Sequence, residues 1–191
     1  MSVPVPQRVT AESPGGVTVM AADEQDAEPV DTAKLARLGE RVLHAEQVGG
    51  DVEVTLLFVG EDTIADLNQK FMEQAGPTDV LSFPIDDALV ADRRGDESSG
   101  EGPGRHLTMP VESPPLLLGD IVICPAVARR NAPTHAGTYD DELALLVVHG
   151  VLHLLGLDHA VDDERRAMQA KERELLAQFW GPLSADPWSG P

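Results

Sequence analysis

The sequence has little cysteine and no long apolar run, and each shortage excludes a class of protein. Its 191 residues contain one cysteine, Cys124, so the chain forms no internal disulfide and no zinc cluster built from cysteines alone. The most apolar stretch, Leu143 to Leu157, spans 15 residues and contains two histidines, fewer than the roughly 20 apolar residues that cross a bilayer. Met1 to Ala21 lacks the apolar segment of a secretory signal. We therefore expect a protein of the reducing cytoplasm with no membrane partner.

Basic residues are also scarce. The chain has 14 Lys and Arg against 33 Asp and Glu, which gives a formal net charge of −19. This balance argues against a broad basic face, the usual electrostatic footprint of nucleic-acid binding. The only stretch of positive net charge is 115–137, through Arg129 and Arg130. Any anionic partner must therefore be held locally.

Apolar periodicity predicts a single layered domain. Alternating apolar residues predict four strands, at 17–20, 51–59, 80–83 and 116–123. Helical spacing and capping residues predict five helices, at 31–49, 61–72, 125–131, 138–155 and from 162 onward. The predicted fold class is therefore α+β, a mixed α/β layer in which a small four-stranded sheet packs with about five helices.

Three segments lie outside this pattern. Residues 1–15, which are rich in Pro, Ser and Gly, are predicted to be a disordered extension, and residues 181–191 a disordered tail. Residues 86–114 are poor in apolar side chains and rich in Gly, Pro, Ser and acid, which predicts a mobile acidic loop. This loop is either a spacer or a gate. The single domain then spans 16–180 and includes the loop.

Three of the six histidines, His149, His153 and His159, lie within eleven residues. On a helix, residues four apart project from one face about 6 Å apart along the axis, as two ligands of one metal ion require. Gly156 ends the helix and lets the chain turn back toward its last turn, which would bring His159 in as a third ligand. A single histidine in an apolar run is more often a packed core residue, but three nitrogen ligands with an open fourth position are typical of catalytic zinc. We therefore expect one zinc ion on these histidines.

The same spacing matches a zinc-protease signature, H-E-x-x-H-x-x-G-x-x-H, in every position but one. Gly150 stands where that signature needs a glutamate as general base, and a glycine accepts no proton from water. Met168 falls in a predicted helix, whereas the protease pattern places a methionine in a turn beneath the site. A zinc peptidase-like hydrolase is therefore an alternative and not the main hypothesis.

Three motifs of this chain occur together in one known family. They are His149-Gly150-x-x-His153-Leu154-x-Gly156-x-Asp158-His159, Leu67-Asn68 followed by Pro77-Thr78-Asp79-Val80-Leu81-Ser82-Phe83-Pro84, and Leu118-Gly119-Asp120-Ile121-Val122-Ile123. Over about 17–176 the chain resembles the YbeY family of bacterial rRNA maturation factors, which are single-strand-specific metallo-endoribonucleases. The resemblance implies a zinc-dependent hydrolase that processes the 3′ end of small-subunit rRNA in the cytoplasm and acts in ribosome quality control. The implied partners are single-stranded rRNA and small-subunit ribosomal proteins or assembly factors.

The resemblance leaves the roles beyond metal binding open. No catalytic base is assigned. Asp158 is a candidate to orient a ligand imidazole, because it adjoins one. Family members often carry an arginine where this chain has Met72, and methionine forms no ion pair with phosphate. Arg129 and Arg130 are the candidate substrate-binding residues, with a solvated helix face as the alternative.

The coordination number separates two functional classes. Three protein ligands favour catalysis, whereas a fourth would close the zinc site. The protein would then be a non-enzymatic ribosome-assembly factor with a structural zinc. By residue type, the possible fourth ligands are Cys124, His135 and Asp158.

Overall fold

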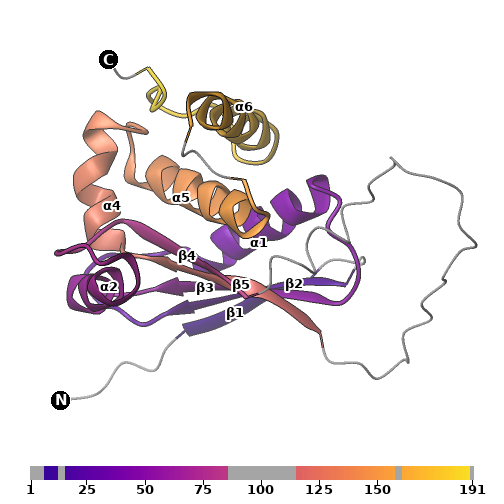
Figure 1. Cartoon of the computed structure of the whole chain (residues 1–191), viewed down its shortest axis with the longest axis horizontal. Helices are drawn as coiled ribbons and strands as arrows, with labels where there is room; N and C mark the ends of the chain where they lie inside the picture. The colour runs from indigo at the N-terminus through magenta and orange to yellow at the C-terminus, as the bar shows by residue number, and fades with distance from the viewer. Residues whose placement is uncertain (1–6, 13–15, 86–114, 158–160, 190–191) are drawn as a thin grey trace, which may run out of the picture.

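A five-stranded mixed sheet forms the base of the protein (Figure 1). The computed structural model describes residues 7–12, 16–85, 115–157 and 161–189. The strands are β1 (Gln7–Glu12), β2 (Val17–Asp23), β3 (Val52–Phe58), β4 (Val80–Pro84) and β5 (Leu116–Ile123). Their order is β1-β2-β3-β5-β4; β2, β3 and β5 are parallel, and β1 and β4 pair antiparallel with their neighbours. The predicted α+β class is confirmed.

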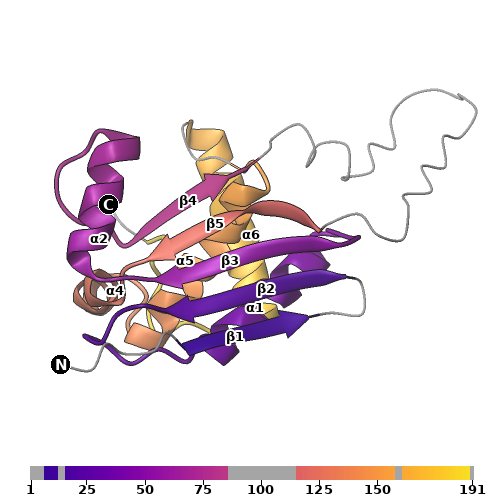
Figure 2. The same ribbon diagram turned by 90° about the horizontal axis from the view of Figure 1, so that it is seen from below.

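Helices cover one face of this sheet. The helical elements are α1 (Thr32–Ala45), α2 (Glu61–Leu67), the π-helical turn η1 (Asn68–Met72), α4 (Pro125–Asn131), the 3-10 turn η2 (Ala132–Thr134), α5 (Tyr139–Leu154) and α6 (Asp162–Phe179). Figure 1 shows α1 and α5 against the sheet and α6 outside them, with α2 and α4 at one end of the strands. Figure 2 shows that no helix among the described segments lies across the opposite face. None of the described helices is long and apolar enough to cross a membrane.

Both ends of α5 follow signals that were visible in the sequence. At its start, the Thr138 hydroxyl accepts a hydrogen bond from the Asp141 backbone N–H at 3.2 Å, as an N-cap does. At its end, Gly156 adopts a φ of +79°, and its N–H donates to the His153 carbonyl at 2.9 Å. The next N–H, from Leu157, donates to the Leu152 carbonyl at 3.0 Å and completes a Schellman motif. The motif places His153 in the last turn of α5.

The sheet has one strand more than the sequence predicted. Gln7–Glu12 pairs antiparallel with β2, so the prediction that 1–15 is a disordered extension is wrong for residues 7–12. Ala11 is the buried apolar residue of this strand. Val9 and Ala11 are the apolar residues of this six-residue strand, so its side chains give little strand signal.

The predicted disordered tail over 181–191 is likewise wrong for residues 181–189. The Ala185 N–H donates to the Ala136 carbonyl at 3.0 Å, and the Ser184 N–H donates to a carboxylate oxygen of Asp141 at 3.0 Å. The segment is held because it supplies donors to polar groups around the start of α5. The predicted acidic loop over 86–114 lies outside the described residues.

Gly150 allows α5 to cross β5 at close range. A Cβ atom at this position would lie 2.6 Å from Cγ2 of Ile121, a fully buried residue of β5. The residue after His149 therefore faces the sheet, where no glutamate side chain fits. The glycine that departs from the protease signature thus has a packing reason, and the peptidase alternative loses its general base.

A matched pair of glycine substitutions tests this packing. Gly150→Ala gains about 1 kcal/mol of helix propensity, but overpacking against Ile121 costs about 1–3 kcal/mol, so we expect a net loss of stability. Gly39→Ala, in the middle of α1, places its Cβ 3.6 Å from Val19, an ordinary contact, and is expected to stabilise the fold by up to about 1 kcal/mol. Urea unfolding of both variants measures the difference. Equal effects of the two substitutions would contradict the close approach of α5 and β5.

Candidate metal centre

His149 and His153 project together from α5, as their spacing predicts. Their Nε2 atoms lie 3.1 Å apart, and the ring centroids are 4.5 Å apart with the rings nearly perpendicular. Two nitrogen ligands about 2.1 Å from a tetrahedral zinc ion are separated by about 3.4 Å. The arrangement of these two imidazoles therefore fits coordination of one shared cation.

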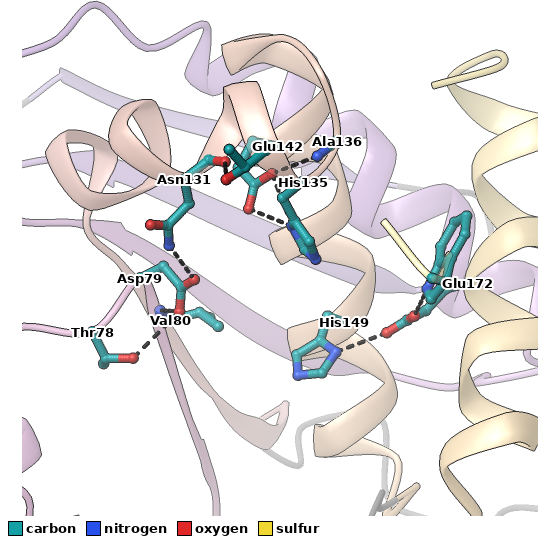
Figure 3. Close-up of polar contacts among 11 residues, drawn as sticks. Thr78, Asp79, Val80, Asn131, His135, Ala136, Glu142, His149 and Glu172 are labelled. Carbon is teal, nitrogen blue, oxygen red and sulfur yellow. Dashed lines mark hydrogen bonds and ion pairs between the residues drawn. The ribbon is translucent and has the colours of Figure 1, made fainter. Parts of the chain in front are cut away.

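A buried carboxylate sets the orientation of His149. The Glu172 side chain, on α6, is 5% exposed, and its Oε1 lies 2.7 Å from Nδ1 of His149 (Figure 3). A carboxylate accepts the hydrogen on Nδ1, which leaves the lone pair of the imidazole on Nε2, the atom that faces His153. Histidines that bind metal ions are commonly held in this way by a carboxylate, which also raises their basicity as ligands.

The C-terminal segment completes the environment of this carboxylate. The indole N–H of Trp188 donates to Oε2 of Glu172 at 2.7 Å, so each oxygen of Glu172 has one described partner. Glu172 lies outside the motifs from which the site was predicted. A signal was present, because Glu172 is the one charged residue on a helix face whose other buried members are Met168, Leu175 and Leu176. A glutamate at an apolar position of an amphipathic helix indicates a buried partner.

Two cavities meet at His149. The first, of about 240 Å³, lies between α5 and α6 and includes Asp79, His135, Glu172 and Trp188 in its lining. The second, of about 490 Å³, is lined on one side by His149, His153 and Leu157 and on the other by β4 and Met72. Met72, where the resemblance leads us to expect an arginine, thus lines the same cavity as the histidines. Its side chain offers a substrate phosphate no charge.

Neither Arg129 nor Arg130 lines these cavities. The Arg129 guanidinium lies 2.6 Å from a Glu28 carboxylate oxygen and over the ring of Tyr139. Arg130 donates two hydrogen bonds to Glu61, at 2.6 and 2.8 Å, which raises the pKa of the guanidinium and lowers the pKa of the Glu61 carboxyl. These pairs are largely exposed, and such pairs are weak. The structure does not place the two arginines beside the histidines. Their role in substrate binding stays a prediction.

The remaining predicted groups divide between described and undescribed parts of the chain. Asp158 and His159 lie outside the described residues, so their roles stay predictions. Within the described ranges, no group of three or more His, Cys, Asp or Glu side chains forms a metal cluster. Cys124 is buried in an apolar cluster with Val59 and Ile64, where burial raises the pKa of its thiol, and it lines neither cavity.

Comparison with known proteins points to one family. A family described as Endoribonuclease YbeY matches residues 20–180. The endoribonuclease YbeY of Frankia casuarinae is 42% identical over 165 residues, which cover 86% of this chain and 76% of the relative. The Thermobifida fusca relative of the same name is 45% identical over 149 residues, covering 78% and 86%. The solution structure of TM1509 from Thermotoga maritima is similar with a TM-score of 0.50 and 30% identity, over 81% of this chain and 86% of that one.

Proposed function

Because the chain belongs to the YbeY family of endoribonucleases, we propose that it is a zinc-dependent hydrolase that cleaves single-stranded RNA. In this proposal His149, His153 and His159 hold one zinc ion. The observation that supports it best is the 3.1 Å separation of the His149 and His153 Nε2 atoms, with Nδ1 of His149 fixed on Glu172. This set of donors is suited to zinc because the two Nε2 atoms lie close enough together to share one ion.

The chain's own residues prepare the site for hydrolysis. The ion, when bound, supplies a Lewis acid that lowers the pKa of water and offsets the charge that develops on the phosphate. Glu172 keeps the His149 ring in the tautomer and orientation that metal binding needs. The cavity of about 490 Å³ beside both histidines offers room for part of an RNA strand.

We further propose that the enzyme matures the 3′ end of small-subunit rRNA and serves ribosome quality control in the cytoplasm. The net charge of −19 and the pairing of Arg129 and Arg130 with acids leave little cationic surface for RNA. Affinity for a particular RNA site must then come from a partner, for which a small-subunit ribosomal protein or an assembly factor is suited. A partner bound to the ribosome would raise the local concentration of the RNA end.

Strand specificity and metal dependence test this function directly. Zinc-loaded protein is incubated with an end-labelled RNA, either single or annealed to its complement. We expect internal cleavage of the single strand, little cleavage of the duplex, and loss of activity in a strong chelator that zinc restores. Elemental analysis is expected to find about one zinc per chain, as one tetrahedral site requires. Absence of cleavage by the zinc-loaded protein, or cleavage that a chelator leaves unchanged, would overturn the proposal.

A further inference from the structure

His135, which lines the first cavity together with His149, forms a second histidine–glutamate pair with Glu142 (Figure 3). Nδ1 of His135 lies 2.9 and 3.0 Å from the two carboxylate oxygens of Glu142. Glu142 is on α5, two turns before His149, and its side chain is fully buried. The pair repeats the arrangement of His149 and Glu172, and its histidine is one of the possible fourth ligands by residue type.

The segment that carries His135 is held in place on both sides. The Ala136 N–H donates to Oε2 of Glu142 at 3.1 Å, and the Gly137 N–H donates to the Ala132 carbonyl at 2.7 Å. Gly137 has a φ of +95°, and the C-terminal segment packs so closely that a Cβ there would lie 2.8 Å from the Ala185 nitrogen. The backbone that carries the His135 ring is therefore held by contacts with Glu142 and the C-terminal segment.

The orientation of His135 suits proton transfer. Its Nδ1–H donates to Glu142, so the lone pair resides on Nε2, and the buried carboxylate stabilises the imidazolium that forms when Nε2 takes up a proton. The hydrogen bond to Glu142 raises the pKa of His135; burial of the ring opposes this increase in part, and the charges of Glu142, Asp79 and Glu172 add smaller increases. A base whose pKa lies near the working pH is effective in general catalysis.

The other charged groups around the cavity favour proton uptake over anion binding. Asp79, before β4, accepts hydrogen bonds from Asn131 at 3.0 Å and from the Val80 N–H at 2.9 Å, and is thus fixed beside the cavity. Glu172 faces it from α6, and the Arg165 guanidinium, which also lines it, is paired with Asp162. The wall is therefore rich in acid, which stabilises a protonated imidazole and leaves the phosphate to the adjoining cavity, of which His149 is also a lining residue.

We propose that His135 is the proton acceptor in RNA hydrolysis by this enzyme. Its Nε2 atom removes a proton from the attacking water while a bond forms between the water oxygen and phosphorus. The bridging P–O bond breaks, the leaving oxygen takes a proton from solvent, and His135 returns its proton to solvent. This inference rests on the proposed function, since it concerns the same reaction, and it assigns the base that the glycine after His149 does not supply.

His135→Ala is the direct test, with His44→Ala as the matched control on the exposed end of α1. We expect kcat for the single-stranded RNA to fall by about 100- to 10,000-fold in His135→Ala, because a general base contributes that much. KM and zinc content are expected to stay close to the wild-type values, and added imidazole to restore part of kcat. The control is expected to keep the wild-type kcat.

Glu142→Gln gives a readout that a merely structural role would not change. The amide of Gln has one acceptor oxygen, which serves Nδ1 of His135 or the Ala136 N–H, and it carries no charge, so the pKa of His135 falls. A base acts in its neutral form, and the activity of the wild type therefore rises with pH through the pKa of His135. In Glu142→Gln the midpoint of this rise is expected to move to lower pH.

Three results would overturn the assignment. The first is an unchanged kcat in His135→Ala. The second is a loss of zinc that parallels the loss of activity, which would make His135 a metal ligand. The third is a raised KM with unchanged kcat, which would make His135 a substrate contact. Cleavage of single-stranded RNA by the wild-type protein shows whether the assignment of His135 fails alone or together with the proposed function. If the zinc-loaded wild type cleaves single-stranded RNA and His135→Ala does so equally well, only the inference about His135 fails.

Discussion

His149→Ala is expected to lose bound zinc and RNA cleavage together. His149 is the predicted ligand whose Nε2 lies 3.1 Å from the Nε2 of His153 and whose Nδ1 is held by Glu172. Without it, His153 and His159 alone would have to hold the ion. Because a metal Lewis acid supplies several kcal/mol of transition-state stabilisation, we expect cleavage to fall by about 1,000-fold or more.

The measurement combines elemental analysis with cleavage of a single-stranded RNA by the same preparations. His153→Ala is expected to behave like His149→Ala, and His44→Ala, which removes an exposed imidazole far from α5 in sequence, to behave like the wild type. Cleavage that persists in zinc-free His149→Ala protein would trace the activity to a contaminating nuclease. Zinc retained at the wild-type level would contradict the assignment of His149 as a ligand.

The same variants distinguish catalytic zinc from structural zinc. A structural ion contributes directly to folding, so its loss lowers the unfolding temperature strongly. In the proposed site the ion is held at the end of α5, and the core between the sheet, α1 and α5 is built from apolar side chains that do not depend on it. We therefore expect His149→Ala to lose activity while it keeps its fold, as circular dichroism would show.

The sequence predicted those parts of the site that depend on neighbours along the chain. The i, i+4 spacing of His149 and His153, the Thr138 cap and the turn at Gly156 are each decided within a few residues. For this reason α5 and the orientation of its two histidines follow from local rules. The strands β2 to β5 follow likewise from alternation of apolar residues.

The missed contacts are those between distant segments. Glu172 lies 23 residues beyond His149, and Trp188 a further 16 residues along, so no local pattern links them. The tail over 181–189 looked disordered because it is short and rich in Pro, Ser and Gly, yet it is fixed by bonds to groups on α5 and α6. The carboxylates that hold this segment lie far from it in sequence. Its order can therefore be predicted only once the fold shows which groups lie beside it.

Glu172 is therefore the residue whose replacement separates orientation from coordination. Glu172→Ala removes the acceptor of both His149 and Trp188, and zinc affinity is expected to fall by about 10- to 100-fold, the usual effect of losing a carboxylate that orients a metal-bound histidine. Glu172→Gln removes the charge, and its amide offers one acceptor oxygen for two donors, so we expect a smaller loss.

Trp188→Phe completes the series, because it frees one oxygen of Glu172 and leaves the other on His149. We expect its zinc affinity to stay near that of the wild type, so that the order of affinities is Trp188→Phe, then Glu172→Gln, then Glu172→Ala. Competition with a zinc-binding dye, without RNA, gives each affinity, and thermal unfolding of the metal-free proteins checks that each variant is folded. Wild-type zinc affinity in folded Glu172→Ala would show that His149 binds the ion without the carboxylate. The contact between α5 and α6 would then serve stability alone.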